Sequence, residues 1–168
     1  MAQIIIKTSI DKNNVEAFLD KVYIACKTDP NLSFRPMSEI INAYKKELLL
    51  IATENSSAVG WLLRIPFNKN CQELAAGYVL KKYRSLGIFN KLIEKALSYS
   101  QSSIIVTFNY RLAEFLMQKK GFKKSSLIEA IRLSKARFLF NRMNFGRVKS
   151  IHKHYRKSKP IYVVFTYE

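Results

Sequence analysis

The stretch that decides the fold of this chain is Gly77-Tyr78-Val79-Leu80-Lys81-Lys82-Tyr83-Arg84-Ser85-Leu86-Gly87-Ile88-Phe89-Asn90. Its first residues end an apolar run that predicts a strand, and Gly87 begins an amphipathic segment that predicts a helix. A glycine-bearing loop at a helix N-terminus presents unpaired backbone N–H groups at the positive end of the helix dipole. Such a loop suits a pyrophosphate, and Lys81, Lys82 and Arg84 add positive charge beside it. Taken alone, the same residues also fit a plain strand-to-helix turn.

The segments around this loop predict elements in the order β-α-α-β-β-β-α-β-α. Before the loop we expect a strand at 3–9, a helix capped by Asn13 or Asn14, a helix over 37–46, and strands over 47–54, 58–66 and 71–80. After it we expect a helix over 87–100, a buried parallel-type strand over 103–108, and a helix over 110–120 closed by Gly121. The segment 126–133 fits either a strand or a helix. Helices are favoured over 134–143 and 147–157, and a final strand over 161–167.

The loop resembles the acetyl-CoA loop of the GNAT (Gcn5-related N-acetyltransferase) family, in which R-x-x-G-x-[GA] follows a strand and opens a helix. The second signature of that family, N-x3-A-x2-L-[Y]-x3-G-F, resembles Asn109, Ala113, Leu116 and Gly121-Phe122. The resemblance covers about residues 1–125 in element order. It implies a single-domain α/β (α+β) GNAT fold over 1–168, with a mixed central sheet of six to seven strands and flanking helices. If 126–133 is the sixth strand, 134–159 is a basic helical insertion before the last strand.

The resemblance also implies an activity, namely transfer of an acetyl or other acyl group from CoA to a primary amine by direct attack. Acetyl-CoA or another acyl-CoA would be the cosubstrate, without a metal, and the acceptor is not identified. By resemblance, Val79 and Leu80 would pair with the pantetheine arm, and Asn109 would contact that arm or an ordered water. The pyrophosphate would be held by the loop residues Arg84, Ser85, Leu86, Gly87, Ile88, Phe89 and Asn90.

Two residues depart from the pattern of the family. Phe89 replaces the last small residue of the loop, which narrows the space beside the phosphates. Met117 falls where many members have the tyrosine that protonates the leaving thiolate, and methionine has no proton to donate. The alternative function is therefore a catalytically weak GNAT-fold binding module for CoA or nucleic acid.

Glu73 matches the position of the catalytic glutamate of some relatives, which makes it the candidate general base. A carboxylate on a mostly apolar strand can have its pKa raised by desolvation, towards the working pH that general-base catalysis needs. A surface glutamate at a strand start is the alternative. Cys71 shares the strand face of Glu73 by alternation and is either a covalent relay or a small hydrophobe. Trp61 is expected in the core, with the wall of the acceptor pocket as the alternative.

The charge of the chain is +17, and it is unevenly distributed. Residues 1–80 hold nine of the 29 basic residues and eight of the 12 acidic ones, and no acidic residue lies between Glu129 and Glu168. A patch of this kind attracts anions. We expect residues 134–159 to recruit an RNA, such as an aminoacylated tRNA, or an anionic membrane surface. The alternative is a lid packed by its apolar face, with a solvated basic exterior.

Composition restricts the remaining classes of protein. The chain has two cysteines and no C-x-x-C pair, so a disulfide framework and a cysteine metal site are disfavoured. His152 and His154 would point in different directions on a helix, so shared metal ligation is not expected. The sequence lacks the roughly 18 consecutive apolar residues of a membrane span and an N-terminal signal peptide. We therefore expect a cytoplasmic protein.

Overall fold

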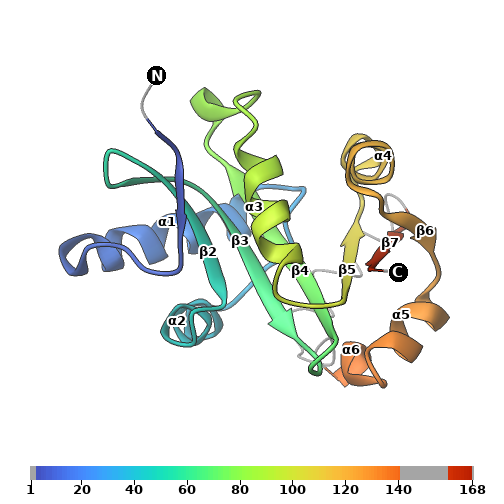
Figure 1. Ribbon diagram of the computed structural model, residues 1–168. Coiled ribbons are helices and arrows are strands. Elements are labelled where there is room, and N and C mark those ends of the chain that lie inside the picture. The colour runs from blue at the N-terminus through green and yellow to red at the C-terminus, as the bar shows by residue number, and fades with distance from the viewer. Residues whose placement is uncertain (1–2, 141–158, 168) are drawn as a thin grey trace. The chain divides into compact units, whose positions relative to one another are not determined.

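The computed structural model describes residues 3–140 and 159–167 (Figure 1). Through Lys120 its elements follow the predicted order β-α-α-β-β-β-α-β-α. The elements are β1 (Ile5–Lys7), α1 (Val15–Thr28), α2 (Met37–Lys45), β2 (Leu49–Glu54), β3 (Ser57–Pro66), β4 (Cys71–Val79), α3 (Ile88–Leu97), β5 (Ser102–Thr107), α4 (Tyr110–Lys120), β6 (Lys123–Ser125), α5 (Leu127–Leu133), α6 (Arg137–Phe140) and β7 (Ile161–Thr166). One-turn 3-10 helices occupy Lys12–Asn14 and Lys81–Tyr83.

The strands form one mixed seven-stranded sheet in the order β1-β2-β3-β4-β5-β7-β6. The β4–β5 pair is parallel, as the apolar character of β5 predicted, and the β1–β2, β2–β3, β5–β7 and β6–β7 pairs are antiparallel. The mixed sheet with flanking helices confirms the predicted fold class. The described residues contribute seven strands to this sheet, the upper of the two expected values.

The chain groups into two compact units, whose boundary passes through β3 and β4. The first unit comprises Met1–Arg64 and Ala75–Tyr99, and the second comprises Ile65–Leu74 and Ser100–Glu168. That 1–168 forms a single domain stays a prediction.

The first unit is built on apolar residues with the periodicities that the sequence predicted. In α1, Phe18, Leu19 and Val22 are buried, and in β2 the whole run Leu49–Ala52 is at most 1% exposed. The buried face of α3 consists of Ile88, Leu92, Ile93, Ala96 and Leu97, and α3 packs on β1 and β2. Asn14 does occupy the N-cap of α1, but its side chain makes no capping bond, and the preceding turn is closed by Asp11, which accepts from the Asn13 N–H.

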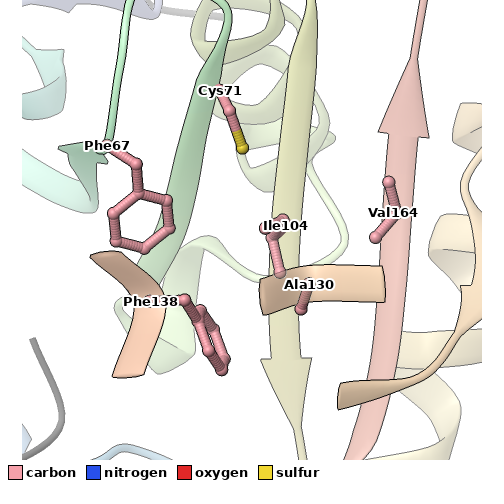
Figure 2. Packing of buried hydrophobic residues seen from close by; sticks show 6 residues of the cluster. All are labelled: Phe67, Cys71, Ile104, Ala130, Phe138 and Val164. Carbon is pink, nitrogen blue, oxygen red and sulfur yellow. The ribbon is translucent and has the colours of Figure 1, made fainter. Parts of the chain in front are cut away.

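The second unit has a separate apolar cluster, seen in Figure 2. It joins Phe67 after β3, Cys71 of β4, Ile104 of β5, Ala130 of α5, Phe138 of α6 and Val164 of β7. The rings of Phe67 and Phe138 meet edge to face, with centroids 6.0 Å apart. Figure 2 shows these side chains converging between the strands and the two short helices. The apolar side of α5 and α6 therefore covers this face of β4, β5 and β7.

The open alternative for 126–133 is resolved in favour of a helix, so this segment is not the sixth strand. That strand is Lys123–Ser125, which pairs with β7, and α5 follows directly. Ser126 caps α5 by accepting from the Glu129 N–H at 3.2 Å. The helical insertion thus begins at α5 rather than at residue 134. The helix expected over 134–143 is seen as α6 within the described residues, and the helix expected over 147–157 lies outside them.

Candidate functional site

The loop between β4 and α3 lies in the first unit and has an unusual backbone. Ser85 and Gly87 both take left-handed conformations, with φ of 69° and 71°. Gly87 is the N-cap of α3 and, having no side chain, makes no capping bond; the Lys91 N–H makes a helical bond to the Gly87 carbonyl at 3.1 Å. A Cβ on Gly87 would have no atom within 4 Å, so glycine is needed here for its φ and not for space. Left-handed residues that lead into an uncapped helix make a concave backbone surface suited to an anion.

The loop is open to solvent and carries positive charge. Lys81, Lys82, Arg84, Ser85, Leu86 and Gly87 are all exposed, whereas Ile88 is buried and fixes the start of α3 in the core. Lys82 and Arg84 each lie near an aromatic ring: Lys82 Nζ is 4.8 Å from the centroid of Tyr83, and the Arg84 guanidinium carbon is 5.5 Å from that of Tyr78. The Arg84 Nε donates to the Val79 carbonyl at 3.1 Å. Chemically, the arrangement can accept a phosphate group through backbone amides and nearby cations.

The last loop residues pack back on the unit. A Cβ added to Gly77 of β4 would lie 2.7 Å from Cε2 of Phe89, so the absence of a side chain at Gly77 makes room for the Phe89 ring. Asn90 donates from Nδ2 to Glu94 Oε1 at 2.9 Å within α3. That Phe89 narrows the space beside a bound phosphate stays a prediction.

The end of β4 has its backbone groups partly engaged. The Leu80 N–H donates to the Val59 carbonyl of β3 at 2.9 Å, and the Leu80 carbonyl accepts from the Tyr83 N–H at 2.8 Å. The Val79 carbonyl accepts from Arg84, but a carbonyl oxygen has two lone pairs and can accept a second donor. Pairing of a ligand with Val79 is therefore compatible with the Arg84 bond.

A bend in β4 is a feature that sequence reasoning missed. Ala76 has a φ of 49°, which non-glycine residues adopt at a cost of about 1 kcal/mol or more. In the second unit the parallel register of β4 with β5 runs from Cys71 to Glu73 only. The run Leu74-Ala75-Ala76 has no glycine or other marker that would have revealed a left-handed residue within a strand.

Glu73 and Cys71 lie in the second unit on β4, opposite Ile104 and Ser102 of β5. Glu73 is 4% exposed, so it is not the surface glutamate of the alternative interpretation. Cys71 is 1% exposed and belongs to the apolar cluster of Figure 2. Burial raises the pKa of the Cys71 thiol to about 11, and the charge of Glu73 acts in the same direction. A thiol that stays protonated is a poor nucleophile, so Cys71 is a small core residue rather than a relay.

The second sequence signature maps onto the ends and the buried face of α4. Asn109 is the N-cap, and its Oδ1 accepts from the Leu112 N–H at 3.2 Å. Ala113 and Leu116 are at most 1% exposed. Gly121, with a φ of 68°, ends the helix, and Phe122 packs with its ring centroid 5.5 Å from that of Phe165. The signature therefore has a complete structural explanation within the second unit, and capping is a role of Asn109 that the sequence analysis did not assign.

The predicted site residues thus fall into two groups. The loop residues Arg84 to Asn90, with Val79 and Leu80, lie together in the first unit. Glu73, Asn109 and the half-buried Met117 of α4 belong to the second unit. Trp61 of the first unit is 1% exposed, as its expected core position requires.

The described residues show neither a metal-binding cluster nor a membrane-spanning helix. Within 3–140 and 159–167, no cluster of three or more histidine, cysteine, aspartate or glutamate side chains is arranged to hold a metal ion. In the same ranges no helix has the length and apolar character to cross a bilayer. His152 and His154 lie outside these ranges.

Comparison with known proteins gives similarity in structure but not in sequence. Neither a protein-family model nor a curated protein matches the sequence. A GNAT-family acetyltransferase from Staphylococcus aureus Mu50 superposes with a TM-score of 0.67 at 16% identity, over 99% of this chain and 100% of that one. The protein yncA from Salmonella typhimurium, solved with its cofactor acetyl-CoA, gives a TM-score of 0.66 at 12% identity, over 99% and 95%.

A third similar structure is N-acetylglutamate synthase from Neisseria gonorrhoeae, complexed with coenzyme A and N-acetyl-glutamate. Its TM-score is 0.69 at 14% identity, and the match covers all of this chain but only 36% of the synthase. At such identities the similarity establishes the fold. The resemblance suggested by the loop and by α4 is confirmed at this level: the chain has the fold of the GNAT acetyltransferases.

Proposed function

We propose that this protein is a cytoplasmic acyl-CoA-dependent N-acyltransferase that moves an acetyl or other acyl group from CoA to a primary amine. The observation that supports it most is the uncapped N-terminus of α3, entered through left-handed residues at Ser85 and Gly87 and bordered by exposed cations. An anion of the size of a pyrophosphate is the ligand that such a backbone surface suits. Similar structures solved with CoA or acetyl-CoA support the choice of that ligand.

Each predicted residue has a proposed role in this function. Residues Arg84 to Asn90 form the pyrophosphate loop, and Val79 and Leu80 pair with the pantetheine arm. Asn109 contacts that arm or an ordered water from its place at the start of α4. Glu73 takes the proton from the acceptor amine, directly or through water, as a general base.

The test of the cofactor site uses two variants at one position. Gly87→Asp and Gly87→Asn introduce side chains of nearly equal size at the same φ, and open space around Gly87 accommodates both. Only the aspartate adds a negative charge where the phosphates are proposed to lie. We expect Gly87→Asp to weaken acetyl-CoA binding about tenfold more than Gly87→Asn, as measured by calorimetry. Equal affinities of the two variants, or no acetyl-CoA binding by the wild-type protein, would remove the proposal.

A CoA-binding module without efficient turnover is the second candidate function, and Met117 favours it. The half-buried methionine has no proton for a leaving thiolate, so water or another group must supply it. Release of free CoA thiol in the presence of acetyl-CoA and a panel of amines separates the two candidates. Binding without thiol release on any amine would support the module.

We further propose that the basic insertion recruits a polyanion, either an RNA such as tRNA or an anionic membrane. Among its described residues, Lys135 is exposed and accessible to a polyanion. Arg137 donates from Nη1 to the Phe67 carbonyl, so its side chain also stabilises the second unit. An electrophoretic shift with tRNA over a salt series, beside flotation with anionic vesicles, tests the two ligands. If the protein bound neither tRNA nor the vesicles at low salt, the insertion would be a packed lid without a polyanionic ligand.

A further inference from the structure

The side chain of Arg84 is turned toward β4, although the sequence suggested that it supplies charge to phosphates. Its Nε donates to the Val79 carbonyl at 3.1 Å, and its guanidinium lies over the Tyr78 ring at 5.5 Å. Two contacts of different kinds, on two successive residues of β4, thus fix one side chain of the loop. A guanidinium can make both at once because it combines a planar face with N–H donors in its plane.

The Tyr78 ring is itself held in place by a row of aromatic side chains. It stacks on Trp61 of β3, with centroids 4.9 Å apart and planes 24° apart. Trp61 is 1% exposed and meets Phe18 of α1 edge to face at 6.0 Å. The row Phe18–Trp61–Tyr78–Arg84 therefore extends from the core of the first unit to its phosphate loop. A ring with this support gives Arg84 a fixed surface to lie on.

The residue that follows explains why the loop needs such an attachment. Ser85 is a non-glycine residue in the left-handed region, with a φ of 69°, and such a conformation persists only where its surroundings hold it. Arg84 is the residue immediately before it, and its own backbone N–H donates to the Lys81 carbonyl at 3.2 Å. Arg84 is thus tied through both side chain and backbone at the point where the chain turns into α3.

We infer that Arg84 is a positioning residue, whose guanidinium ties the loop to Val79 and Tyr78 so that the backbone amides at the start of α3 face an anion. This inference rests on the proposed CoA site and deepens it. The exposed Lys81 and Lys82, rather than Arg84, supply the side-chain charge that attracts the phosphates. Tyr78 acts through Arg84 and is a positioning residue as well.

The experiment compares charge with shape at one position and measures CoA affinity over a KCl series. Arg84→Lys keeps the positive charge but loses the planar face and the Nε donor. We expect Arg84→Lys and Arg84→Gln to weaken CoA binding equally, about tenfold, as expected for one hydrogen bond and one cation–π contact. The dependence of affinity on salt should stay that of the wild type in Arg84→Lys, which keeps the charge. Lys82→Gln is the charge control: it should reduce the salt dependence, because exposed charges are screened by salt.

The role of Tyr78 is tested in a double-mutant cycle. Tyr78→Phe keeps the ring and should bind CoA like the wild type, whereas Tyr78→Leu should weaken binding. The double variant Tyr78→Leu, Arg84→Gln should lose no more CoA affinity than Arg84→Gln alone, because both substitutions remove the same contact between Arg84 and the Tyr78 ring. Amide hydrogen exchange of residues 85–90 in the unliganded variants should be faster than in the wild type. This readout needs no ligand and reports the position of the loop directly.

The outcomes separate the inference from the function it rests on. A wild-type protein that binds no CoA overturns the proposed function, whatever the variants do to hydrogen exchange. Full affinity of Arg84→Lys shows that the charge of Arg84, and not its planar donor group, is what matters, and overturns the inference. Thermal unfolding of each variant, with Tyr78→Phe as the reference for Tyr78→Leu, shows whether the fold is retained.

Discussion

Glu73 shows at the scale of a residue how much a sequence can say about a site. The resemblance pointed to its position, and the structure adds that the carboxyl is buried on β4. The sequence could not show burial, because a glutamate near the start of a strand is as compatible with solvent as with a core. For Arg84 the sequence showed the charge but not its direction, since the partner is a backbone carbonyl five residues earlier and not a side chain.

Replacing Glu73 by Gln removes the proposed base and keeps the shape. We expect the turnover number to fall about a hundredfold or more, the usual contribution of general-base catalysis, with CoA affinity nearly unchanged. Steady-state kinetics with acetyl-CoA and calorimetry with CoA measure the two quantities. Glu114→Gln, on an exposed position of α4, is the matched control. Unchanged turnover in Glu73→Gln would take this residue out of the mechanism.

The elements were predictable where the signal is local. In α4, Asn109 marks the start, Ala113 and Leu116 the buried face, and Gly121 the end. In α3, the apolar residues form a complete face. The helix α5 had a local signal too, the capping box Ser126-Leu127-Ile128-Glu129, in which Ser126 caps the helix. The apolar pattern of 126–133 fits a strand as well as a helix, so the sequence left both interpretations open. The bend at Ala76 had no local signal, and only the tertiary structure reveals it.

The β2–β3 hairpin supports a prediction of stability. Asn55 and Ser56 at its turn both have positive φ, 47° and 65°, and Ser56 is exposed. Asn-Gly is the favoured pair for a turn of this kind, since glycine takes a positive φ without steric cost. We expect Ser56→Gly to raise the free energy of unfolding by about 0.5–1 kcal/mol, measured by chemical denaturation.

The neighbouring replacement serves as the control for the hairpin. Ser56→Ala removes the same hydroxyl but keeps the Cβ, so it should not be stabilising. If Ser56→Gly and Ser56→Ala had the same free energy of unfolding, the left-handed conformation of Ser56 would not be the cause of any change in stability. A loss of stability in Ser56→Gly would contradict the prediction outright.

At the scale of the whole molecule, the predicted fold class and the element order through Lys120 were confirmed, but the grouping into two units was not anticipated. The reason is that the boundary passes through β3 and β4, continuous strands whose sequences show no break. Composition predicts boundaries between segments, where loops and linkers differ from elements. It has nothing to mark a boundary within a strand.

Each unit holds one buried cysteine, which gives the molecule a dependence on alkaline pH. Burial raises the pKa of both Cys26 and Cys71 to about 11, from an ordinary value of 9.0. Between these values the unfolded chain releases the thiol protons while the folded chain keeps them, so unfolding becomes more favourable as pH rises. We expect the free energy of unfolding to fall from about pH 9.0 to pH 11, and to be unaffected by these thiols below that range.

Denaturation of the wild type and of a Cys26→Ala, Cys71→Ala double variant at a series of pH values measures this contribution. The variant should be less stable at neutral pH, because two buried side chains are truncated, but its stability should fall less steeply above pH 9.0. Single variants assign the contribution to each unit. Parallel pH profiles of the wild type and the double variant would show that the thiols do not contribute.

The contact between Phe89 and Gly77 has a consequence for how sequences of this kind diverge. A side chain at Gly77 would collide with the Phe89 ring, and a small residue at 89 would leave the space over Gly77 empty. The two positions therefore change most easily together, and covariation between them is what a comparison of related sequences should reveal. Phe89 and Gly77 are thus a matched pair within the first unit, so the departure of Phe89 from the loop pattern is not by itself a sign that cofactor binding is lost.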